Sequence, residues 1–288
     1  MYSANEIEQI GVAGAGVMGL GIAQVAAQAG YSTVVYDPHE AAIAKAQAEL
    51  QRQLERLVEK GKLPDAERWA ILGRMGYTTE LAMLNGDLII EAAPERLELK
   101  HTLLNAVQAA NEDGAILATN TSTIPISQIA AGLARPEALV GMHFFNPAPL
   151  MPLVEVIAGA ATHPTALATV LAVAQQMGKT PVQVADTPGF IVNRVARPYY
   201  LESLRIAEEG GIDFATIDDL LRGAGFRMGP FELMDLIGID TNHAVSQTLY
   251  AQFFHEPRFR PSRLQQQWVD AGRLGRKTGQ GVYPYPNP

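Results

Sequence analysis

A histidine and a carboxylate stand out in an apolar stretch near the middle of the chain. No lysine or arginine occurs between Arg135 and Lys179, so Glu155 has no cation close to it in sequence. A buried carboxylate without a partner costs several kcal/mol. Of the nearby histidines, only His143 lies in a segment that could run beside the Glu155 strand. The pair predicts a general base held by a carboxylate, although a hydrogen-bonded core histidine would give the same pattern.

The composition excludes several other classes of protein. The 288 residues are 48% hydrophobic and 18% charged, which is typical of a globular protein with a sizeable core. The net charge of −8 disfavours nucleic acid or an anionic membrane as the main partner. Without cysteine, the chain has no disulfide, thiolate metal site or cysteine nucleophile, and we expect no metal. The first nine residues do not resemble a signal peptide and no apolar run is long enough to span a membrane, which predicts a cytoplasmic protein.

A glycine-rich turn near the N-terminus predicts a dinucleotide site. The apolar segment 7–13 leads into Gly14, Gly16 and Gly19, with Val17 and Met18 opening a helical pattern. The first glycine permits a tight turn, the second lets the backbone approach a pyrophosphate, and the third lets the helix pack on the strand. The helix N-terminus favours the negative charge of the phosphates. We therefore expect these five residues to bind a cofactor.

Asp37 indicates which cofactor this is. It ends the next predicted strand, 32–36, and lies 18 residues beyond Gly19. An acid at this point accepts hydrogen bonds from the adenosine ribose and favours NAD over NADP. A helix cap ahead of Pro38 is the alternative explanation for Asp37.

Alternating strands and helices predict an α/β fold with a Rossmann-type, doubly wound sheet in residues 1–186. The further predicted strands and helices of this domain are strands 87–91, 115–119, 139–144, 153–157 and 181–184 and helices near 95–110 and 164–177. Residues 187–288 are predicted to form an all-α domain. Its predicted helices cover 190–209, 213–222, 230–237, 241–254 and 262–271.

A helical hairpin is predicted as an insertion over residues 39–72, with its turn at Gly61 and Pro64. Its first helix carries one stripe of positive charge, formed by Lys45, Arg52, Arg56 and Lys60. Glutamates interleave with these cations, so a solvated salt-bridge face is one explanation of the stripe. Binding of an anionic substrate by Arg52 and Arg56 is the other.

Taken together, these stretches resemble the 3-hydroxyacyl-CoA dehydrogenase family from about residue 7 to residue 283. The matching segments are 14–23, 91–100, 120–122, 143–155, 186–194 and 228–233. The resemblance implies NAD-dependent oxidation of an (S)-3-hydroxyacyl-CoA to the 3-oxoacyl-CoA, and the reverse reaction, as in fatty acid β-oxidation. It also implies an acyl-CoA substrate, 3-hydroxybutyryl-CoA or another short chain, and a homodimer. The resemblance further implies that residues 187–288 line the substrate cleft and form the dimer contact.

The same resemblance assigns roles to individual residues. It makes His143 the general base, Glu155 the residue that orients it, and Ser122 and Asn193 the groups that bind the reacting oxygens. It puts Glu95 and Lys100 at the nicotinamide end of the cofactor and Asn120 beside both substrate and nicotinamide. From their sequence alone, Ser122 could instead be a turn or cap residue, and Asn193 an ordinary residue of a first helical turn.

The chain departs from the family pattern at one informative position. Arg227 stands where many members have proline, just before Met228. An arginine there could pair with a distal carboxylate, which makes 3-hydroxyadipyl-CoA an alternative substrate. Two further alternatives are a related dehydrogenase of free hydroxy acids and a catalytically idle protein on the same scaffold.

Overall fold

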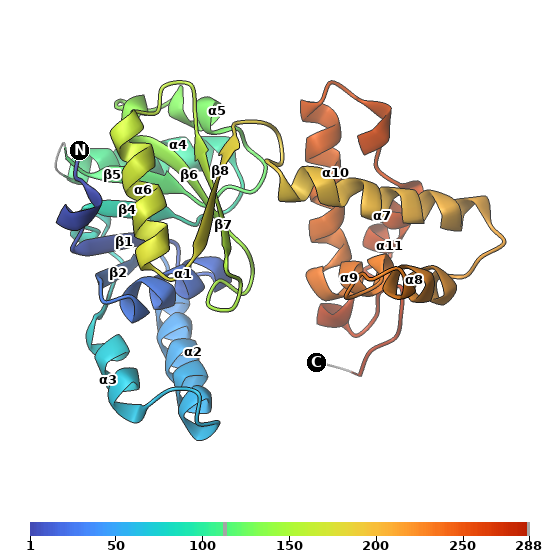
Figure 1. Cartoon of the computed structure of the whole chain (residues 1–288), viewed down its shortest axis with the longest axis horizontal. Helices are drawn as coiled ribbons and strands as arrows, with labels where there is room; N and C mark the ends of the chain where they lie inside the picture. The colour runs from blue at the N-terminus through green and yellow to red at the C-terminus, as the bar shows by residue number, and fades with distance from the viewer. Residues whose placement is uncertain (112–113, 287–288) are drawn as a thin grey trace. The chain divides into compact units, whose positions relative to one another are not determined.

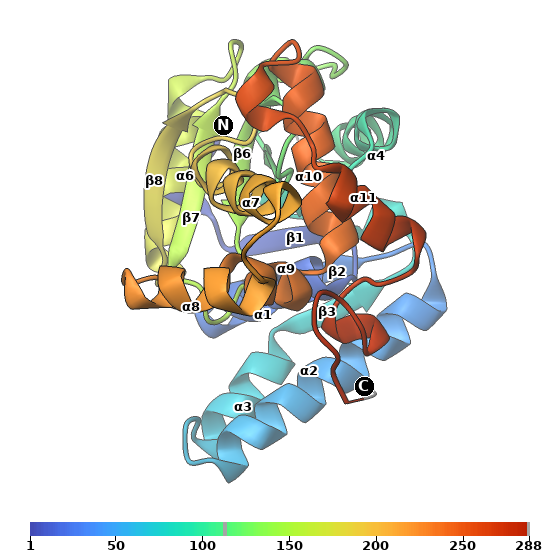
Figure 2. The ribbon, with the colours of Figure 1, turned by 90° about the vertical axis from the view of Figure 1, so that its right-hand side faces the viewer.

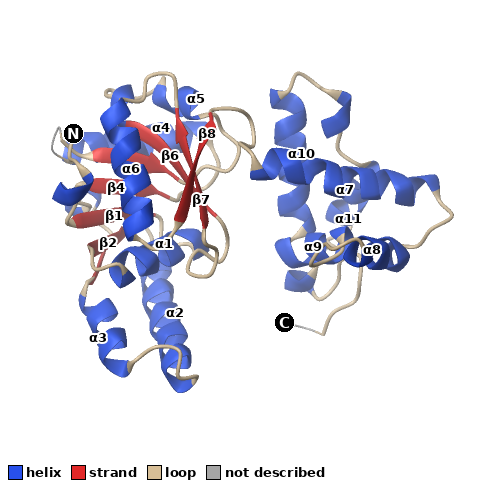
Figure 3. Ribbon diagram, viewed as in Figure 1, coloured by secondary structure: helices blue, strands red, loops and turns tan. Residues whose placement is uncertain are grey.

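The computed structural model describes residues 1–111 and 114–286, which form two compact units, Met1–Thr187 and Pro188–Pro288. Figure 1 shows both units, and Figure 3 shows that the strands belong to the first. The division lies one residue after the boundary expected at 186. The last strand of the first unit ends at Ala185 and the first helix of the second begins at Val192, so the division lies in the segment between them.

An eight-stranded sheet forms the centre of the N-terminal unit. Its strand order is β3-β2-β1-β4-β5-β6-β7-β8. The strands are β1 (Gln9–Ala13), β2 (Ser32–Tyr36), β3 (Met75–Thr78), β4 (Leu88–Glu91), β5 (Ile116–Thr119), β6 (Leu139–Phe144), β7 (Leu153–Ala158) and β8 (Thr180–Ala185). The strand order reverses between β1 and β4. Open α/β sheets bind ligands at such a point, at the carboxyl ends of the strands.

Helices cover both faces of this sheet, as the doubly wound prediction requires. In Figures 1 and 2, α6 (Pro164–Gln176) and α4 (Leu97–Ala110) lie on opposite faces. Helix α1 (Val17–Gln28) shares the buried apolar core with α6. The short helix α5 (Ile126–Ala130) packs against β6 and β7. Strands β4, β5 and β6 are buried at every position, as expected for strands covered on two faces.

The predicted helical hairpin is present as α2 (Glu40–Glu59) and α3 (Asp65–Gly73). Helix α2 buries Ile43, Ala46, Leu50 and Leu54, which recur at spacings of three and four residues along one face. The two helices pack on each other and project from the sheet in both views (Figures 1 and 2).

The last part of the sheet reverses direction. Strand β7 runs antiparallel to β6, and β8 runs parallel to β7. A hairpin therefore joins β6 to β7, with its connection over residues 145–152 and a cis peptide bond between Asn146 and Pro147. In this register His143 lies directly opposite Glu155.

Two elements were missing from the sequence-based prediction. Strand β3 has the sequence Met-Gly-Tyr-Thr and is half-buried throughout at the sheet edge, so it shows neither an apolar run nor alternation. Helix α5 has only five residues, fewer than a periodic pattern needs. A residue far away in the sequence holds the start of this helix. The Asp186 carboxylate accepts hydrogen bonds from the backbone N–H groups of Ile126 and Ser127.

The C-terminal unit is all helical within its described residues. Its helices are α7 (Val192–Glu209), α8 (Phe214–Gly223), α9 (Pro230–Ile237), α10 (Ile239–Gln252) and α11 (Arg263–Asp270). They enclose a second apolar core around Leu204, Phe231 and Trp268. Asp235 holds the C-terminal segment to α9, because its carboxylate accepts hydrogen bonds from the backbone N–H groups of Val282 and Tyr283.

None of the helices in the described parts of the chain is both long enough and apolar enough to cross a membrane. Residues 1–111 and 114–286 also contain no group of three histidine, aspartate or glutamate side chains suited to a metal ion.

Candidate active site

The hairpin of β6 and β7 brings His143 and Glu155 together. Their Nδ1 and Oε2 atoms are 2.8 Å apart, and the two residues are only 3% and 1% exposed. The ring of Phe145 lies 4.6 Å from the imidazole, measured between centroids. Because one imidazole nitrogen is bound to the carboxylate, the ring orientation is fixed, and proton exchange with a substrate has to use Nε2. The carboxylate stabilises the imidazolium that forms when the ring accepts a proton.

The loop after β5 carries Asn120 and Ser122, and Asn120 ties this loop to the strand of His143. Asn120 Oδ1 accepts a hydrogen bond of 2.8 Å from the backbone N–H of Phe144, the residue that follows His143. The Ser122 backbone N–H donates to Glu95 at 2.9 Å. These contacts tie the ends of β4, β5 and β6 into one surface at the carboxyl edge of the sheet.

Glu95 organises the loop that contains Ser122. Its Oε1 also accepts hydrogen bonds from the Thr121 hydroxyl and the Thr123 backbone N–H. Burial raises the pKa of Glu95, but Lys100 and the hydrogen bonds from Thr121, Thr123 and Ser122 outweigh it, so the pKa is below its ordinary value. The resulting stabilisation is present at neutral pH and is lost as the pH falls through that lowered pKa.

Glu91 is a buried carboxylate that the sequence analysis did not single out. Its carboxylate accepts hydrogen bonds from Lys100 Nζ at 2.8 and 2.9 Å, and both side chains are almost completely buried. Lys100 Nζ also lies 3.3 Å from Glu95. A single cation thus holds two carboxylates at the end of β4. The sequence did carry a signal for this pair: Glu91 ends a buried strand, and Lys100 follows it nine residues later.

The glycine turn has the geometry that its spacing predicted. Gly14 has a φ of +118°, and a Cβ there would lie 2.7 Å from the Ala92 carbonyl oxygen. A Cβ on Gly19 would overlap the Gly14 carbonyl oxygen, so only glycine allows the close packing of α1 on β1. Gly16 differs, because within the described residues no atom beyond its own chain neighbours lies within 4 Å of its Cβ position. That open space lets a ligand approach the backbone.

A pocket of about 740 Å³ adjoins this turn, and we call it the β4-side pocket. Gly14, Gly16, Val17, Met18 and Asp37 line it. The Asp37 carboxylate accepts hydrogen bonds from the backbone N–H groups of Ala15 and His39, both at 3.0 Å. It therefore braces the turn while facing the pocket. The open turn, the acid at the end of β2 and the pocket fit an adenosine and pyrophosphate, as in a bound NAD.

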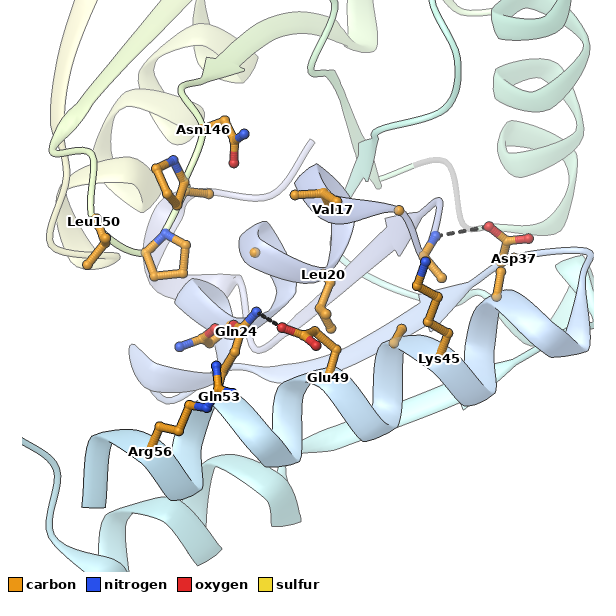
Figure 4. A pocket seen from close by; sticks show the side chains of 18 of the residues that line it. Val17, Leu20, Gln24, Asp37, Lys45, Glu49, Gln53, Arg56, Asn146 and Leu150 are labelled. Carbon is orange, nitrogen blue, oxygen red and sulfur yellow. Dashed lines mark hydrogen bonds between the residues drawn. The ribbon is translucent and has the colours of Figure 1, made fainter. Parts of the chain in front are cut away.

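A second pocket, of about 700 Å³, lies on the other side of the turn, and we call it the α2-side pocket. Figure 4 looks into it, with Lys45, Glu49, Gln53 and Arg56 along one helix and Asn146 and Leu150 opposite them. Arg52 does not line this pocket and forms an ion pair with Glu49. Of the two arginines of α2 that were expected to bind substrate, only Arg56 lines this pocket.

Asn193 and Arg227 belong to the C-terminal unit. Asn193 lies in the first turn of α7, and its carbonyl oxygen accepts a hydrogen bond from Arg197 Nε at 3.3 Å. Arg227 is exposed and precedes α9 by three residues.

Comparison with known proteins agrees with this geometry over almost the whole chain. Residues 9–187 match the NAD-binding domain of 3-hydroxyacyl-CoA dehydrogenase, and residues 189–285 match its C-terminal domain. The chain belongs to the 3-hydroxyacyl-CoA dehydrogenase family. The family is one of NAD-dependent oxidoreductases, which confirms the predicted cofactor and reaction class.

Relatives within this 3-hydroxyacyl-CoA dehydrogenase family are named for different acyl groups. A 3-hydroxyadipyl-CoA dehydrogenase of Escherichia coli is 45% identical over 97% of this chain, which spans only 59% of that relative. A probable 3-hydroxybutyryl-CoA dehydrogenase of Deinococcus radiodurans is 41% identical over 96% of this chain and the whole of that protein. The crystal structure of (S)-3-hydroxybutyryl-CoA dehydrogenase from Ralstonia eutropha has a TM-score of 0.93 at 41% identity, covering 98% of this chain and 100% of that one.

Asp37 offers a test of cofactor selection in this dehydrogenase. Replacing it with alanine is expected to lower the preference for NADH over NADPH, as a ratio of kcat/KM values, by about tenfold, because the ribose acceptor and the negative charge are both lost. Steady-state rates with each cofactor measure the ratio. Glu40→Ala, at an exposed position outside the β4-side pocket, is the control. An unchanged preference in Asp37→Ala would mean that other residues select the cofactor.

Proposed function

We propose that this protein oxidises (S)-3-hydroxyacyl-CoA to 3-oxoacyl-CoA with NAD, and catalyses the reverse reduction. The observation that carries the proposal is the buried pair of His143 and Glu155, joined by a 2.8 Å hydrogen bond. Oxidation of a secondary alcohol requires a group that removes the hydroxyl proton near neutral pH, and histidine is suited to that task.

In the proposed mechanism His143 takes the proton of the 3-hydroxyl group through Nε2. Glu155 holds the ring and stabilises the imidazolium that results. A bound NAD would supply the acceptor for the hydride that leaves C3, the carbon that bears this hydroxyl group. In the reverse direction the protonated His143 donates its proton to the ketone oxygen. Ser122 and Asn193 are proposed to donate hydrogen bonds to the reacting oxygens, which stabilises negative charge as it develops.

The cofactor is proposed to follow the carboxyl edge of the sheet. Gly14, Gly16, Val17 and Met18 would hold its pyrophosphate, and Asp37 its adenosine ribose. Gly19 would contribute by letting α1 pack closely on the turn. The nicotinamide end would lie by Glu95, Lys100 and Asn120. This path of the cofactor is supported by the hydrogen bond between Asn120 and the backbone beside His143. That bond brings the proposed nicotinamide end of the site close to the proposed base.

The CoA part of the substrate is proposed to extend into the α2-side pocket. Asn146 lines that pocket and follows His143 by only three residues, so a thioester reacting at His143 has this space within reach. Arg56 faces the pocket and supplies positive charge for the phosphates. Arg52 remains a candidate at the rim, where its ion pair with Glu49 would compete with a phosphate.

Consumption of NADH tests the proposal directly. The substrates are acetoacetyl-CoA, 3-oxoadipyl-CoA and free acetoacetate. We expect turnover of the thioesters and a large loss of rate in variants of His143. Turnover of free acetoacetate alone would instead favour a dehydrogenase of free hydroxy acids, and the absence of any turnover would favour an idle scaffold.

A short-chain substrate such as 3-hydroxybutyryl-CoA is the first candidate, and 3-hydroxyadipyl-CoA is the second. The second is favoured by Arg227, an exposed arginine that forms no direct ion pair within the described residues. A guanidinium with no carboxylate of its own protein is suited to bind a distal carboxylate of a substrate. The 45% identical relative named for 3-hydroxyadipyl-CoA is in keeping with this candidate.

Arg227→Ala distinguishes these two candidates. If Arg227 binds the distal carboxylate, the ratio of kcat/KM for 3-oxoadipyl-CoA to that for acetoacetyl-CoA is expected to fall by about tenfold in the variant, since a charge-assisted hydrogen bond is lost. Arg260→Ala, at another exposed position of the same unit, is the matched control. An unchanged ratio in Arg227→Ala would remove the basis for a dicarboxylic substrate.

Assembly as a homodimer through the helical unit, and a cytoplasmic location, stay predictions. Large apolar side chains of that unit are exposed, among them Val195 at 69% and Leu220 at 63%. Surfaces of this kind are typical of protein–protein contacts, which supports the homodimer.

A further inference from the structure

The charged cluster at the end of β4 carries more negative than positive charge. The Glu91 carboxylate accepts two hydrogen bonds from Lys100 Nζ, and two more from the Thr119 hydroxyl and the Ala93 backbone N–H. A carboxyl group that accepts at both oxygens and donates from neither is expected to be ionised. Glu95, whose pKa is below its ordinary value, lies 3.3 Å from the same Lys100 Nζ. Two carboxylates and one ammonium group leave these three residues, which we call the Glu91 cluster, with a net charge of −1.

The topology of the sheet brings the Glu91 cluster to one half of the proposed cofactor site. Asp37 ends β2 and the glycine turn follows β1, so the adenosine and the pyrophosphate are proposed to lie at this part of the sheet. A dinucleotide crosses the point where the strand order reverses, here between β1 and β4. The nicotinamide half then falls on the side of β4, which ends at Glu91. The residue after Glu91 touches the glycine turn, because a Cβ on Gly14 would lie 2.7 Å from the Ala92 carbonyl oxygen.

The two redox forms of the cofactor differ in charge at this end. The oxidised nicotinamide ring carries one positive charge, and the reduced ring carries none. A nearby negative charge favours the positively charged form of a group over its neutral form. Glu91 and Lys100 are 0% and 1% exposed, so water screens them little. The neighbouring Arg96 and Glu98 are exposed and are therefore screened.

We propose that Glu91 gives its cluster an excess negative charge that strengthens the binding of oxidised NAD relative to NADH. The inference rests on the proposed function for the place of the nicotinamide. Glu91 is fully buried and acts through its electrostatic field, so it is not a catalytic residue. On the enzyme, the equilibrium between bound ketone and bound alcohol is then shifted toward the alcohol. The equilibrium in solution is unchanged.

The test measures the Kd of oxidised NAD and of NADH, without acyl-CoA, for Glu91→Gln and for the unaltered enzyme. Glutamine keeps the size of Glu91 and an oxygen that accepts hydrogen bonds, and Lys100 keeps Glu95 as an ionic partner. NADH is titrated by its fluorescence, and oxidised NAD by its displacement of NADH. The ratio of Kd for oxidised NAD to Kd for NADH is expected to rise by about tenfold, the lower end of what one neighbouring charge does to an ionisation equilibrium. For a two-electron couple this raises the potential of the bound cofactor by about 30 mV.

Three further variants separate the charge of the Glu91 cluster from its structural role. Glu91→Gln/Lys100→Met has the same net charge as the unaltered cluster, so its ratio should return to the original value even where both affinities fall. Glu95→Gln removes one negative charge at the edge of the cluster, and it should raise the ratio even if Glu91→Gln does not fold. Glu67→Gln, at an exposed position of α3, should leave the ratio unchanged.

The ratio of the two Kd values decides the inference. An unchanged ratio in Glu91→Gln would overturn it, as would an equal loss of affinity for both forms of the cofactor, which is the result expected of a purely structural ion pair. A raised ratio that the double variant does not restore would overturn it too. If the unaltered enzyme bound both forms of the cofactor but reduced no 3-oxoacyl-CoA, the proposed function would fail, and the ratio would still test the charge effect.

Discussion

Replacing His143 with glutamine is expected to lower kcat for acetoacetyl-CoA reduction by about 10³-fold, within the range that general acid–base catalysis contributes. Glutamine keeps a polar side chain of similar reach, but it cannot accept and release a proton near neutral pH. The buried position of His143 leaves no bulk water to replace it directly. Stopped-flow or steady-state measurement of NADH consumption at saturating substrate gives kcat. Titration of the variant with NADH checks that the cofactor still binds.

Glu155→Gln is the companion variant for this prediction. It keeps an oxygen that can accept the hydrogen bond from His143 and removes only the negative charge, so we expect a smaller loss of about 10²-fold. The order of the two effects follows from the direct part played by His143. Rates that are unaltered in His143→Gln would refute the general-base role, and a larger loss in Glu155→Gln than in His143→Gln would reverse the assignment of roles.

Replacing Lys100 with methionine is expected to lower the free energy of unfolding by about 3–5 kcal/mol, the cost of leaving a buried carboxylate without its cation. Glu91 is fully buried, and its remaining hydrogen bonds come from the Thr119 hydroxyl and the Ala93 backbone. Neither group carries a positive charge. Denaturant unfolding of the cofactor-free enzyme measures the loss and keeps it separate from any effect on NAD binding.

The double variant Glu91→Gln/Lys100→Met provides the control for this prediction. It removes both charges, so it should recover a large part of the stability that Lys100→Met loses. Lys62→Met, at an exposed position, should change the stability by well under about 1 kcal/mol. If the double variant were less stable than Lys100→Met, the ion pair would not be the source of the effect.

Much of the fold and part of the site could be predicted from the sequence because the relevant signals are local. Six consecutive residues specify the glycine turn, and one periodic pattern with a central turn predicts the helical hairpin of α2 and α3. His143 and Glu155 were paired by an argument about charge: no other group near in sequence could compensate the carboxylate. The register of β6 and β7 places them opposite each other, as that argument requires.

The remaining features depend on contacts between distant segments. Strand β3 is held by pairing with β2, and its own residues carry no pattern. The reversal of β7 relative to β6 follows from a short connection whose direction is not encoded in periodicity. Arg56 lines the α2-side pocket, whereas Arg52 pairs with Glu49. This difference depends on how α2 packs beside the glycine turn, and in the sequence both arginines belong to the same charged stripe.

The hairpin of β6 and β7 also has a consequence for the order in which the molecule is made. Its two proposed catalytic groups are separated by 12 residues and belong to adjacent strands, so their meeting requires the closure of only a short loop. During synthesis, β6 can add to β5 and pair with β7 while the helical unit is still to be translated. The geometry of the base is therefore established by the N-terminal unit alone.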